Sequence, residues 1–160
     1  ANFLTFFGDD LNNSATVPLA AFPNSIAAET DFLSNLVGVG TEDFESFATG
    51  TGEPLGLTFP GAGAATLSGG GGEIETVTPG TTNGFGRYAT SGSNYWEVAA
   101  GGTNNFVVDF DDPVAAFGFF GVDIGDFGGQ LELELTNGVI ETLTVSNTEG
   151  SFGSTDGLVL

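Results

Sequence analysis

Residues 130–145 read QLELELTNGVIETLTV, and the fold class can be argued outward from this stretch. Three leucines alternate with two glutamates in its first half, so one face of the segment is apolar and the other is acidic. Asn137-Gly138 follows, the residue pair that favours a type I′ turn in a two-residue hairpin. Residues 139–145 complete a second strand. The stretch therefore predicts an antiparallel β-hairpin.

Further short runs with a two-residue period, or with continuous apolar character, predict strands elsewhere. They cover residues 3–7, 44–47, 55–59, 73–77, 95–98, 106–110 and 114–124. Glycine and proline separate most of them, and Gly8-Asp9-Asp10 is expected to form a turn after the first. Val114–Val122 is continuously apolar, which is typical of a strand buried on both faces or covered by a neighbour.

One helix is predicted at residues 25–37. Asn24 or Ser25 is expected to cap its beginning, and Gly38 is a natural residue just after its end. The apolar residues expected to form its buried face are Ile26, Phe32, Leu33, Leu36 and Val37. One helix among many short strands predicts a single domain over residues 1–160, mostly β, built as an antiparallel β-sandwich or jelly roll.

The charge balance excludes several classes of function. The chain has 21 acidic residues and one basic residue, Arg87, and a net charge of −20. Nucleic acid and anionic membranes would repel such a protein. It has no His and no Cys, so a Ser–His–Asp triad and thiol chemistry are impossible. Glycoside hydrolysis needs only a pair of carboxylates, but among 21 acidic residues some pair will always lie at a suitable distance, so this pattern does not indicate such an enzyme. We therefore expect no enzymatic activity.

The composition also bears on localisation. The chain contains no Met and begins Ala1-Asn2-Phe3, which predicts a secreted, extracellular or cell-surface protein after removal of a signal peptide. A mean hydropathy of +0.18 and 16 Phe argue for a folded core rather than disorder.

Aspartates gather at several expected turns, and Ca²⁺ prefers carboxylate and carbonyl oxygens from such loops. The candidate ligands are Asp9, Asp10, Asp109, Asp111, Asp112, Asp123 and Asp126. The alternative is that they are solvated turn residues, because aspartate favours turns without any metal.

Two further features have a structural and a functional interpretation. Arg87 is expected to form a bidentate salt bridge, with substrate binding as the alternative. Tyr95-Trp96 is expected in the core, with a flat platform for carbohydrate as the alternative.

Four segments carry a family resemblance: residues 6–12, 28–33, 84–88 ahead of Tyr95-Trp96, and 118–127. With these segments the chain resembles the extracellular domains of PEP-CTERM proteins, which Gram-negative bacteria secrete together with exopolysaccharide. The resemblance implies export, a β-sandwich rich in Gly, Asn and Thr, and a role at the cell surface or in a biofilm matrix. The chain lacks the Pro-Glu-Pro motif, membrane helix and arginine cluster typical of that group's C-terminus.

Related sandwiches continue past a segment like residues 157–160 into a further strand, so an open sheet edge is expected here. Open edges recruit strands from other chains. The sequence thus predicts a structural protein that forms a homopolymeric filament or matrix by donor-strand complementation. The candidate subunit-interface residues are Phe3, Leu4, Thr5, Phe6, Phe7, Leu158, Val159 and Leu160. The alternative is a Ca²⁺-dependent carbohydrate-binding module of the extracellular matrix.

Overall fold

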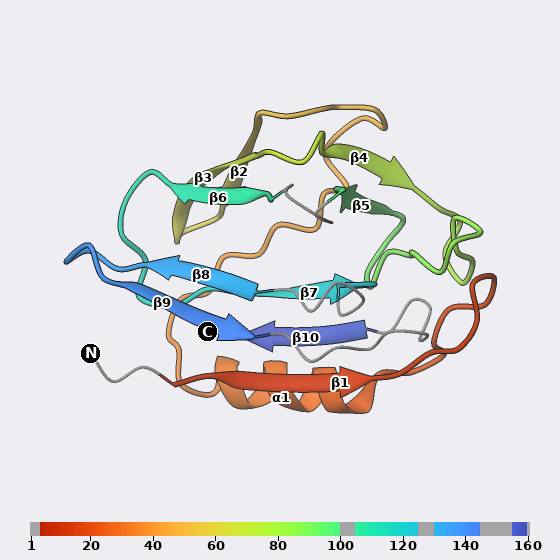
Figure 1. Cartoon of the computed structure of the whole chain (residues 1–160), viewed down its shortest axis with the longest axis horizontal. Coiled ribbons are helices and arrows are strands. Elements are labelled where there is room, and N and C mark those ends of the chain that lie inside the picture. Colours follow the sequence, from red (N-terminus) through yellow and green to blue (C-terminus); the bar gives the residue numbers. More distant parts are fainter. Residues whose placement is uncertain (1–3, 100–104, 125–129, 145–154, 160) are drawn as a thin grey trace.

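The computed structural model describes residues 4–99, 105–124, 130–144 and 155–159, the last range as backbone only. Within them the chain is mostly β, with one helix and antiparallel sheets, which confirms the expected class. The elements (Figure 1) are β1 (Phe6–Asp10), α1 (Pro23–Leu33), β2 (Leu55–Phe59), β3 (Gly63–Ser68), β4 (Glu73–Thr76), β5 (Asn94–Glu97), β6 (Val107–Phe110), β7 (Gly118–Val122), β8 (Gln130–Glu134), β9 (Ile140–Thr144) and β10 (Thr155–Val159).

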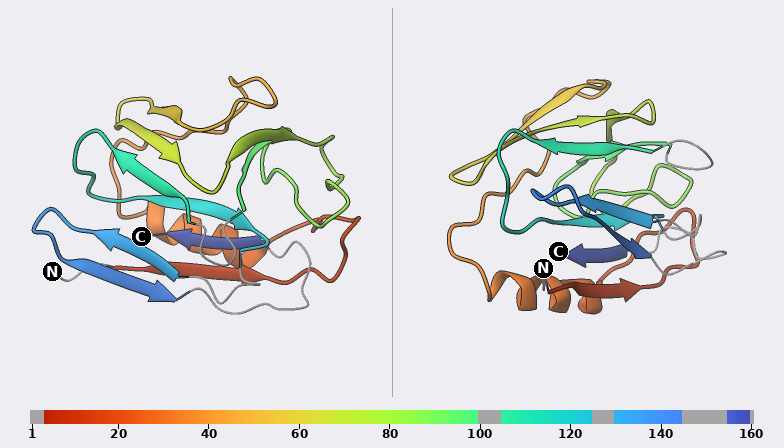
Figure 2. Two further views of the ribbon diagram at one scale, coloured as in Figure 1. Left: turned by 45° about the horizontal axis from the view of Figure 1, so that its top comes forward. Right: turned by 60° about the vertical axis from the view of Figure 1, so that its left-hand side comes forward.

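The strands form two three-stranded sheets and two pairs. One sheet has the order β1-β10-β7 and the other β2-β3-β6, while β4 pairs with β5 and β8 with β9. All of these ladders are antiparallel. Figures 1 and 2 show β2–β3–β6 and β4–β5 in one half of the molecule, and the β1–β10–β7 sheet with α1 in the other. The first and last strands of the chain are therefore neighbours.

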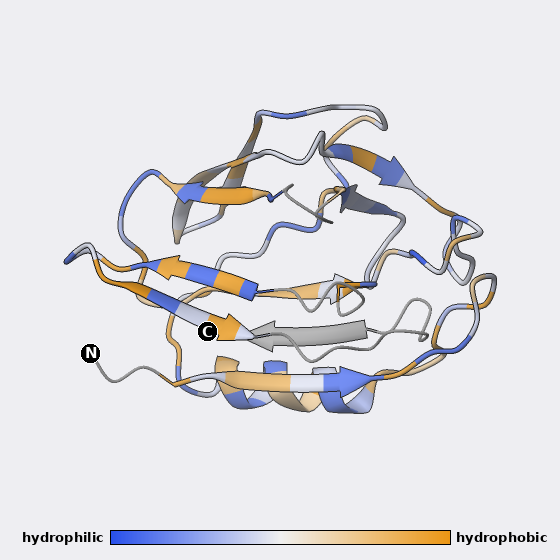
Figure 3. Cartoon of the chain, in the orientation of Figure 1, coloured by the Kyte–Doolittle hydropathy of each residue, from blue (hydrophilic) through white to orange (hydrophobic). Residues whose placement is uncertain are grey.

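The hairpin predicted at residues 130–145 is confirmed as β8 and β9. Leu131 pairs with Leu143 on its half-buried face, and the glutamates of β8 are exposed. Figure 3 shows the resulting alternation along β8. The predicted two-residue turn is wrong. Leu135 accepts a hydrogen bond from the Gly138 N–H at 2.8 Å and donates to the Val139 carbonyl at 2.9 Å, so three residues form the loop.

Only Gly138 in this loop has a positive φ, of 77°. A type I′ turn needs positive φ at both central residues, whereas a three-residue loop needs it only at its last position. Asn137 therefore stays in the ordinary region, and its side-chain carbonyl instead accepts a hydrogen bond from Val139 N–H at 3.0 Å.

The main core lies between the β2–β3–β6 sheet and the β4–β5 pair. It consists of the buried residues Leu55, Leu57, Leu67 and Ile74, with Phe44, Phe47, Phe59, Trp96, Phe106 and Val108 packed around them. Leu67 belongs to β3, a strand that the sequence did not predict because Ala, Thr and Ser make up most of it. Leu55 and Leu67 are register partners in adjacent strands, so their pairing builds the centre of this core.

A series of phenylalanine rings connects the two halves. Phe59 of β2 contacts Phe110 of β6 at 6.2 Å between ring centroids, and Phe110 contacts Phe117 at 5.1 Å. Phe117 in turn contacts Phe119 of β7 at 6.0 Å. Because offset and edge-to-face aromatic pairs favour defined geometries, these rings fix the approach of one sheet to the other.

Helix α1 differs from its prediction in bounds and in face. It begins at Pro23 and ends at Leu33, before the predicted Val37. Its buried residues are Ser25, Ala28 and Phe32. Of the expected apolar face only Phe32 is buried: Leu36 is half-buried, whereas Ile26, Leu33 and Val37 are exposed. No helix among the described residues is long and apolar enough to cross a membrane.

Gly8 of β1 explains why small residues face the sheet. A Cβ at Gly8 would lie 2.1 Å from the Asn24 carbonyl oxygen, so strand and helix backbones are in direct contact there. Ser25 and Ala28 permit this approach, and the larger Phe32 packs further along against Phe6, with ring centroids 6.2 Å apart. Residue size thus outweighed hydrophobicity in deciding which helix face is buried.

Three strand predictions are corrected. Residues 44–47 form a turn, since Phe44 has a φ of 64° and its carbonyl accepts a hydrogen bond from Phe47 N–H at 3.2 Å. β1 begins at Phe6 and continues through Gly8-Asp9-Asp10, where a turn was expected. β7 begins at Gly118 rather than Val114.

Candidate functional site

The two segments predicted to be donated between subunits are paired with each other. Phe6 is the register partner of Val159 and Phe7 that of Leu158, within a ladder of five residue pairs that runs to Asp10 and Thr155. Leu4 and Thr5 precede β1 and are exposed, while Phe3 and Leu160 lie outside the described residues. Among the described strands β1 is at the edge of its sheet, and β10 is central with a ladder on each side.

A groove of about 580 Å³ runs between β1 and α1. Residues of both faces of β1 line it, together with one side of the helix; they include Phe6, Phe7, Asp9, Asn24, Ala27 and Asp31. Phe7 is 42% exposed. The groove therefore combines polar side chains of β1 and α1 with the partly exposed side chain of Phe7.

Asp10, a predicted metal ligand, caps α1. Its carboxylate accepts hydrogen bonds from the backbone N–H groups of Asn24 (3.2 Å) and Ser25 (2.8 Å) and from the Ser25 hydroxyl (2.9 Å). Asp10 is 8% exposed and Ser25 is completely buried. The N-terminal end of a helix has unpaired N–H groups and a partial positive charge, so a carboxylate is favoured there. The sequence placed this cap on Asn24 or Ser25 instead, and that was wrong.

Asp9 is the register partner of Asp156, and its Oδ1 atom is buried without a hydrogen-bond partner among the described residues. Its main-chain carbonyl accepts a hydrogen bond from Asn24 Nδ2 at 2.9 Å. Asp123 follows β7 at the same end of this sheet, because Val122 and Asp10 both pair with Thr155.

The remaining predicted metal ligands are elsewhere. Asp109 lies in β6, and Asp111 and Asp112 follow this strand, whereas Asp123 follows β7. Figure 1 shows that β6 and β7 run in opposite directions, so their C-terminal ends lie apart. Asp126 lies outside the described residues. Among the described residues no group of three or more carboxylates has a geometry suited to a metal ion.

Arg87 bridges two carboxylates rather than holding one in bidentate fashion. Its Nη1 donates to Glu97 Oε1 and its Nε to Asp123 Oδ2, both at 3.1 Å. Glu97 lies in β5, so Arg87 ties the loop before β5 to the end of β7. The side chains of Arg87 and Glu97 are 37% and 29% exposed, and that of Asp123 is 9% exposed. Exposed ion pairs contribute little, but this one joins three separate segments.

Tyr95 extends the same network, because its hydroxyl donates to Glu97 Oε2 at 3.0 Å. Burial, followed by the negative charge of Glu97, raises the pKa of Tyr95 well above its ordinary value. Trp96 packs against the main core, and a Cβ at Gly72 would lie 2.1 Å from its ring. The two adjacent aromatics thus lie half-buried in separate environments.

Two further acids hold loops through main-chain N–H groups, and neither is among the site residues predicted from the sequence. Glu45 accepts hydrogen bonds from Ser93 N–H and Asn94 N–H, each at 2.7 Å, and these bonds lower its pKa. Glu53 accepts from the N–H groups of Gly69 and Gly71. Consecutive N–H groups of a positive-φ glycine run form an anion-binding concavity, so the run at residues 69–72 was the available signal.

Two segments without acidic residues line a small cavity, and the carboxylate of Glu45 lies next to its lining residue Gly92. No acidic residue occurs between Asp10 and Glu29 or between Glu75 and Glu97, and these two segments meet in the fold. Gly86 N–H and the Thr82 hydroxyl donate to the Ala15 carbonyl at 2.8 and 2.7 Å. The cavity between the segments has a volume of about 260 Å³.

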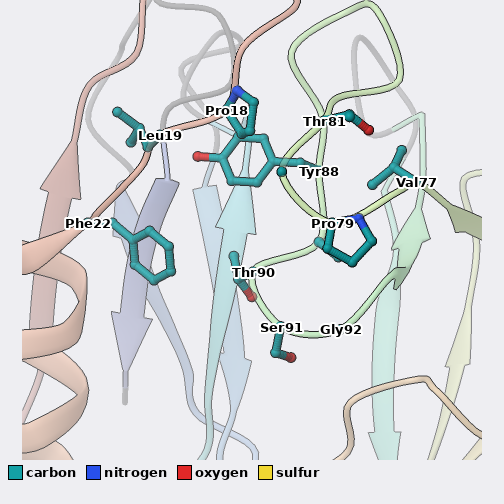
Figure 4. Close-up of a pocket in the computed structure, with 12 residues that line it drawn as sticks. Pro18, Leu19, Phe22, Val77, Pro79, Thr81, Tyr88, Thr90, Ser91 and Gly92 are labelled. Atoms are coloured by element: carbon teal, nitrogen blue, oxygen red, sulfur yellow. The ribbon is translucent and has the colours of Figure 1, made fainter.

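Figure 4 shows Leu19 and Phe22 on one side of this cavity, Val77 and Thr81 on the other, and Tyr88 between them. Comparisons of the chain with protein-family models, curated proteins and solved structures found no match.

Proposed function

We propose that this protein is a secreted structural protein that assembles into an extracellular filament or matrix by exchanging β1 between subunits. The observation that carries the proposal is the β1–β10 ladder: an edge strand paired over five residues with the last strand of the chain. A pairing of this kind forms equally well between two copies, because the same residues meet in the same register. Head-to-tail exchange extends a filament when the rotation between successive subunits does not close a ring.

The geometry favours β1 over β10 as the exchanged strand. Removing β1 breaks one ladder and its contacts with α1, whereas removing β10 breaks two ladders and leaves β1 and β7 without partners. Exchange of β1 also conserves the Asp10 cap, since the carboxylate travels with the strand to the Ser25 site of the neighbouring subunit. Asp10, which the sequence predicts only as a metal ligand, then becomes part of the interface.

Charge sets the conditions for assembly. Each subunit carries −20, so subunits repel one another at low ionic strength. Main-chain hydrogen bonds of a strand ladder are insensitive to net charge, and salt screens the repulsion. We therefore expect assembly to increase with NaCl concentration.

Mixed cysteine crosslinking tests the exchange. The chain has no Cys, so Phe7→Cys and Leu158→Cys each introduce a single thiol. Register partners in an antiparallel ladder have Cα atoms roughly 4.5–5.5 Å apart, within the range that a disulfide spans. The two variants, one of them isotopically labelled, are mixed, assembled and oxidised. The expected product is a labelled–unlabelled disulfide dimer.

The matched control mixes Thr58→Cys with Ala64→Cys, the register partners of the β2–β3 hairpin, and should yield no mixed dimer. Filaments without the Phe7–Leu158 mixed dimer would rule out β1 exchange. Absence of assembly at any salt concentration would rule out the structural function itself. Deleting residues 1–8 is less informative, because it also removes Gly8, whose backbone contacts α1.

A further inference from the structure

We propose that the cavity between residues 18–22 and 77–92 binds a single neutral sugar ring. It is a separate feature from β1 exchange and uses none of the residues of that interface. The chain has 21 acidic residues, but none of the residues that line this cavity is charged.

The walls are apolar and the hydroxyls are available. Phe22, Val77 and Pro79 provide apolar surface, and Thr90 and Ser91 also line the cavity (Figure 4). Neither the Thr90 nor the Ser91 hydroxyl makes a side-chain hydrogen bond to any described residue. A sugar ring has C–H groups on its faces, which can contact the apolar walls of the cavity. It has hydroxyls on its rim, which can form hydrogen bonds with the hydroxyls of Thr90 and Ser91.

Size limits the ligand. A water molecule occupies about 30 Å³ in the liquid, so the 260 Å³ cavity has room for roughly nine waters. Drug-sized ligands fill pockets of roughly 300–1,000 Å³. The cavity therefore suits one ring rather than an oligosaccharide, as in the recognition of a terminal or branching residue.

Charge selects against acidic sugars. The net charge of −20 produces a negative potential around the molecule, which repels uronates and phosphorylated sugars. Arg87, the single basic residue, is next to Tyr88 in sequence, but Glu97 and Asp123 bind its guanidinium. No cation is therefore available at the cavity to compensate an anionic ligand.

Saturation-transfer difference NMR on the full chain tests this inference. The probes are the methyl glycosides of glucose, galactose, mannose and N-acetylglucosamine, with glucuronate and galacturonate as acidic counterparts. At least one neutral glycoside should receive saturation, and neither uronate should. The double variant Thr90→Val and Ser91→Ala keeps the side-chain volumes similar and should weaken binding about tenfold, the effect of losing two hydrogen bonds.

The control double variant, Thr142→Val and Ser46→Ala, removes the same two groups from exposed positions elsewhere and should bind like the parent. The proposal is wrong if no neutral glycoside receives saturation, or if the Thr90/Ser91 variant binds unchanged. Binding of the uronates as strong as that of the neutral glycosides would also overturn the proposal.

Discussion

Asp10 and Ser25 are joined by two hydrogen bonds, one from the Ser25 N–H at 2.8 Å and one from its hydroxyl at 2.9 Å, both to Oδ2. A side chain of β1 thereby caps a helix that begins later in the chain. Because β1 is also the strand we propose to be exchanged, this contact links the stability of the subunit to its assembly.

Removing the cap should destabilise the fold. Asp10→Ala removes the acceptor of the Asn24 and Ser25 N–H groups and one acceptor of the buried Ser25 hydroxyl, and we expect a loss of about 2 kcal/mol in the free energy of unfolding. Urea unfolding followed by circular dichroism measures it. Asp112→Ala, at an exposed position, is the control and should change stability by less than about 0.5 kcal/mol. Equal effects of the two substitutions would contradict the cap.

Two glycine substitutions test the close contact of β1 and α1. Gly8→Ala places a Cβ against the Asn24 carbonyl, and since backbone cannot move aside easily, a loss of about 1–3 kcal/mol is expected. Gly56→Ala in β2 meets nothing within 4 Å and should be neutral or slightly stabilising. Thermal unfolding compares both with the parent. A well-tolerated Gly8→Ala would show that strand and helix are further apart.

Protonation of Glu45 in acid should lower the free energy of unfolding. The N–H groups of Asn94 and Ser93 favour its charged form, so its folded pKa lies below its unfolded pKa. The stabilisation is complete above the unfolded pKa and is lost as pH falls through the folded pKa. The stability difference between the parent and Glu45→Gln should therefore shrink as pH is lowered from 6 to 3 (an interval spanning roughly the usual range for Glu). A difference independent of pH would contradict this assignment.

Tyr95 should lose its hydroxyl proton at a higher pH than an ordinary tyrosine. Burial and Glu97 favour its neutral form, so the stability it confers is present below the unfolded pKa of about 10 and is lost as pH rises from there through the folded value. The chain has two tyrosines, and Tyr88→Phe leaves Tyr95 alone for ultraviolet titration. Glu97→Gln in that background should move the titration to lower pH. An ordinary titration of Tyr95, unaffected by Glu97→Gln, would contradict the described contact.

The sequence pattern predicts a strand well when residues close in sequence decide which of its side chains are buried. β2 matches its prediction at both ends, and the alternation in β8 is the alternation of burial in the structure. The turn at 44–47 has an apolar, strand-like sequence, but Phe44 adopts a left-handed conformation and Asn94 Nδ2 binds the carbonyls of Phe44 and Phe47, both at 3.1 Å. That partner is remote in sequence, so no local pattern could reveal it.

Composition and periodicity by themselves determined the mostly-β fold class, the hairpin at 130–145 and the absence of thiol and histidine side chains, because these depend on which residue types are present and how they alternate. Only the tertiary structure decided that Asp10 caps α1, that Arg87 bridges Glu97 and Asp123, and that two acid-free segments enclose a cavity. Each of these brings together residues distant in sequence, and the contact depends on backbone approach and side-chain size. Local patterns carry no information on either.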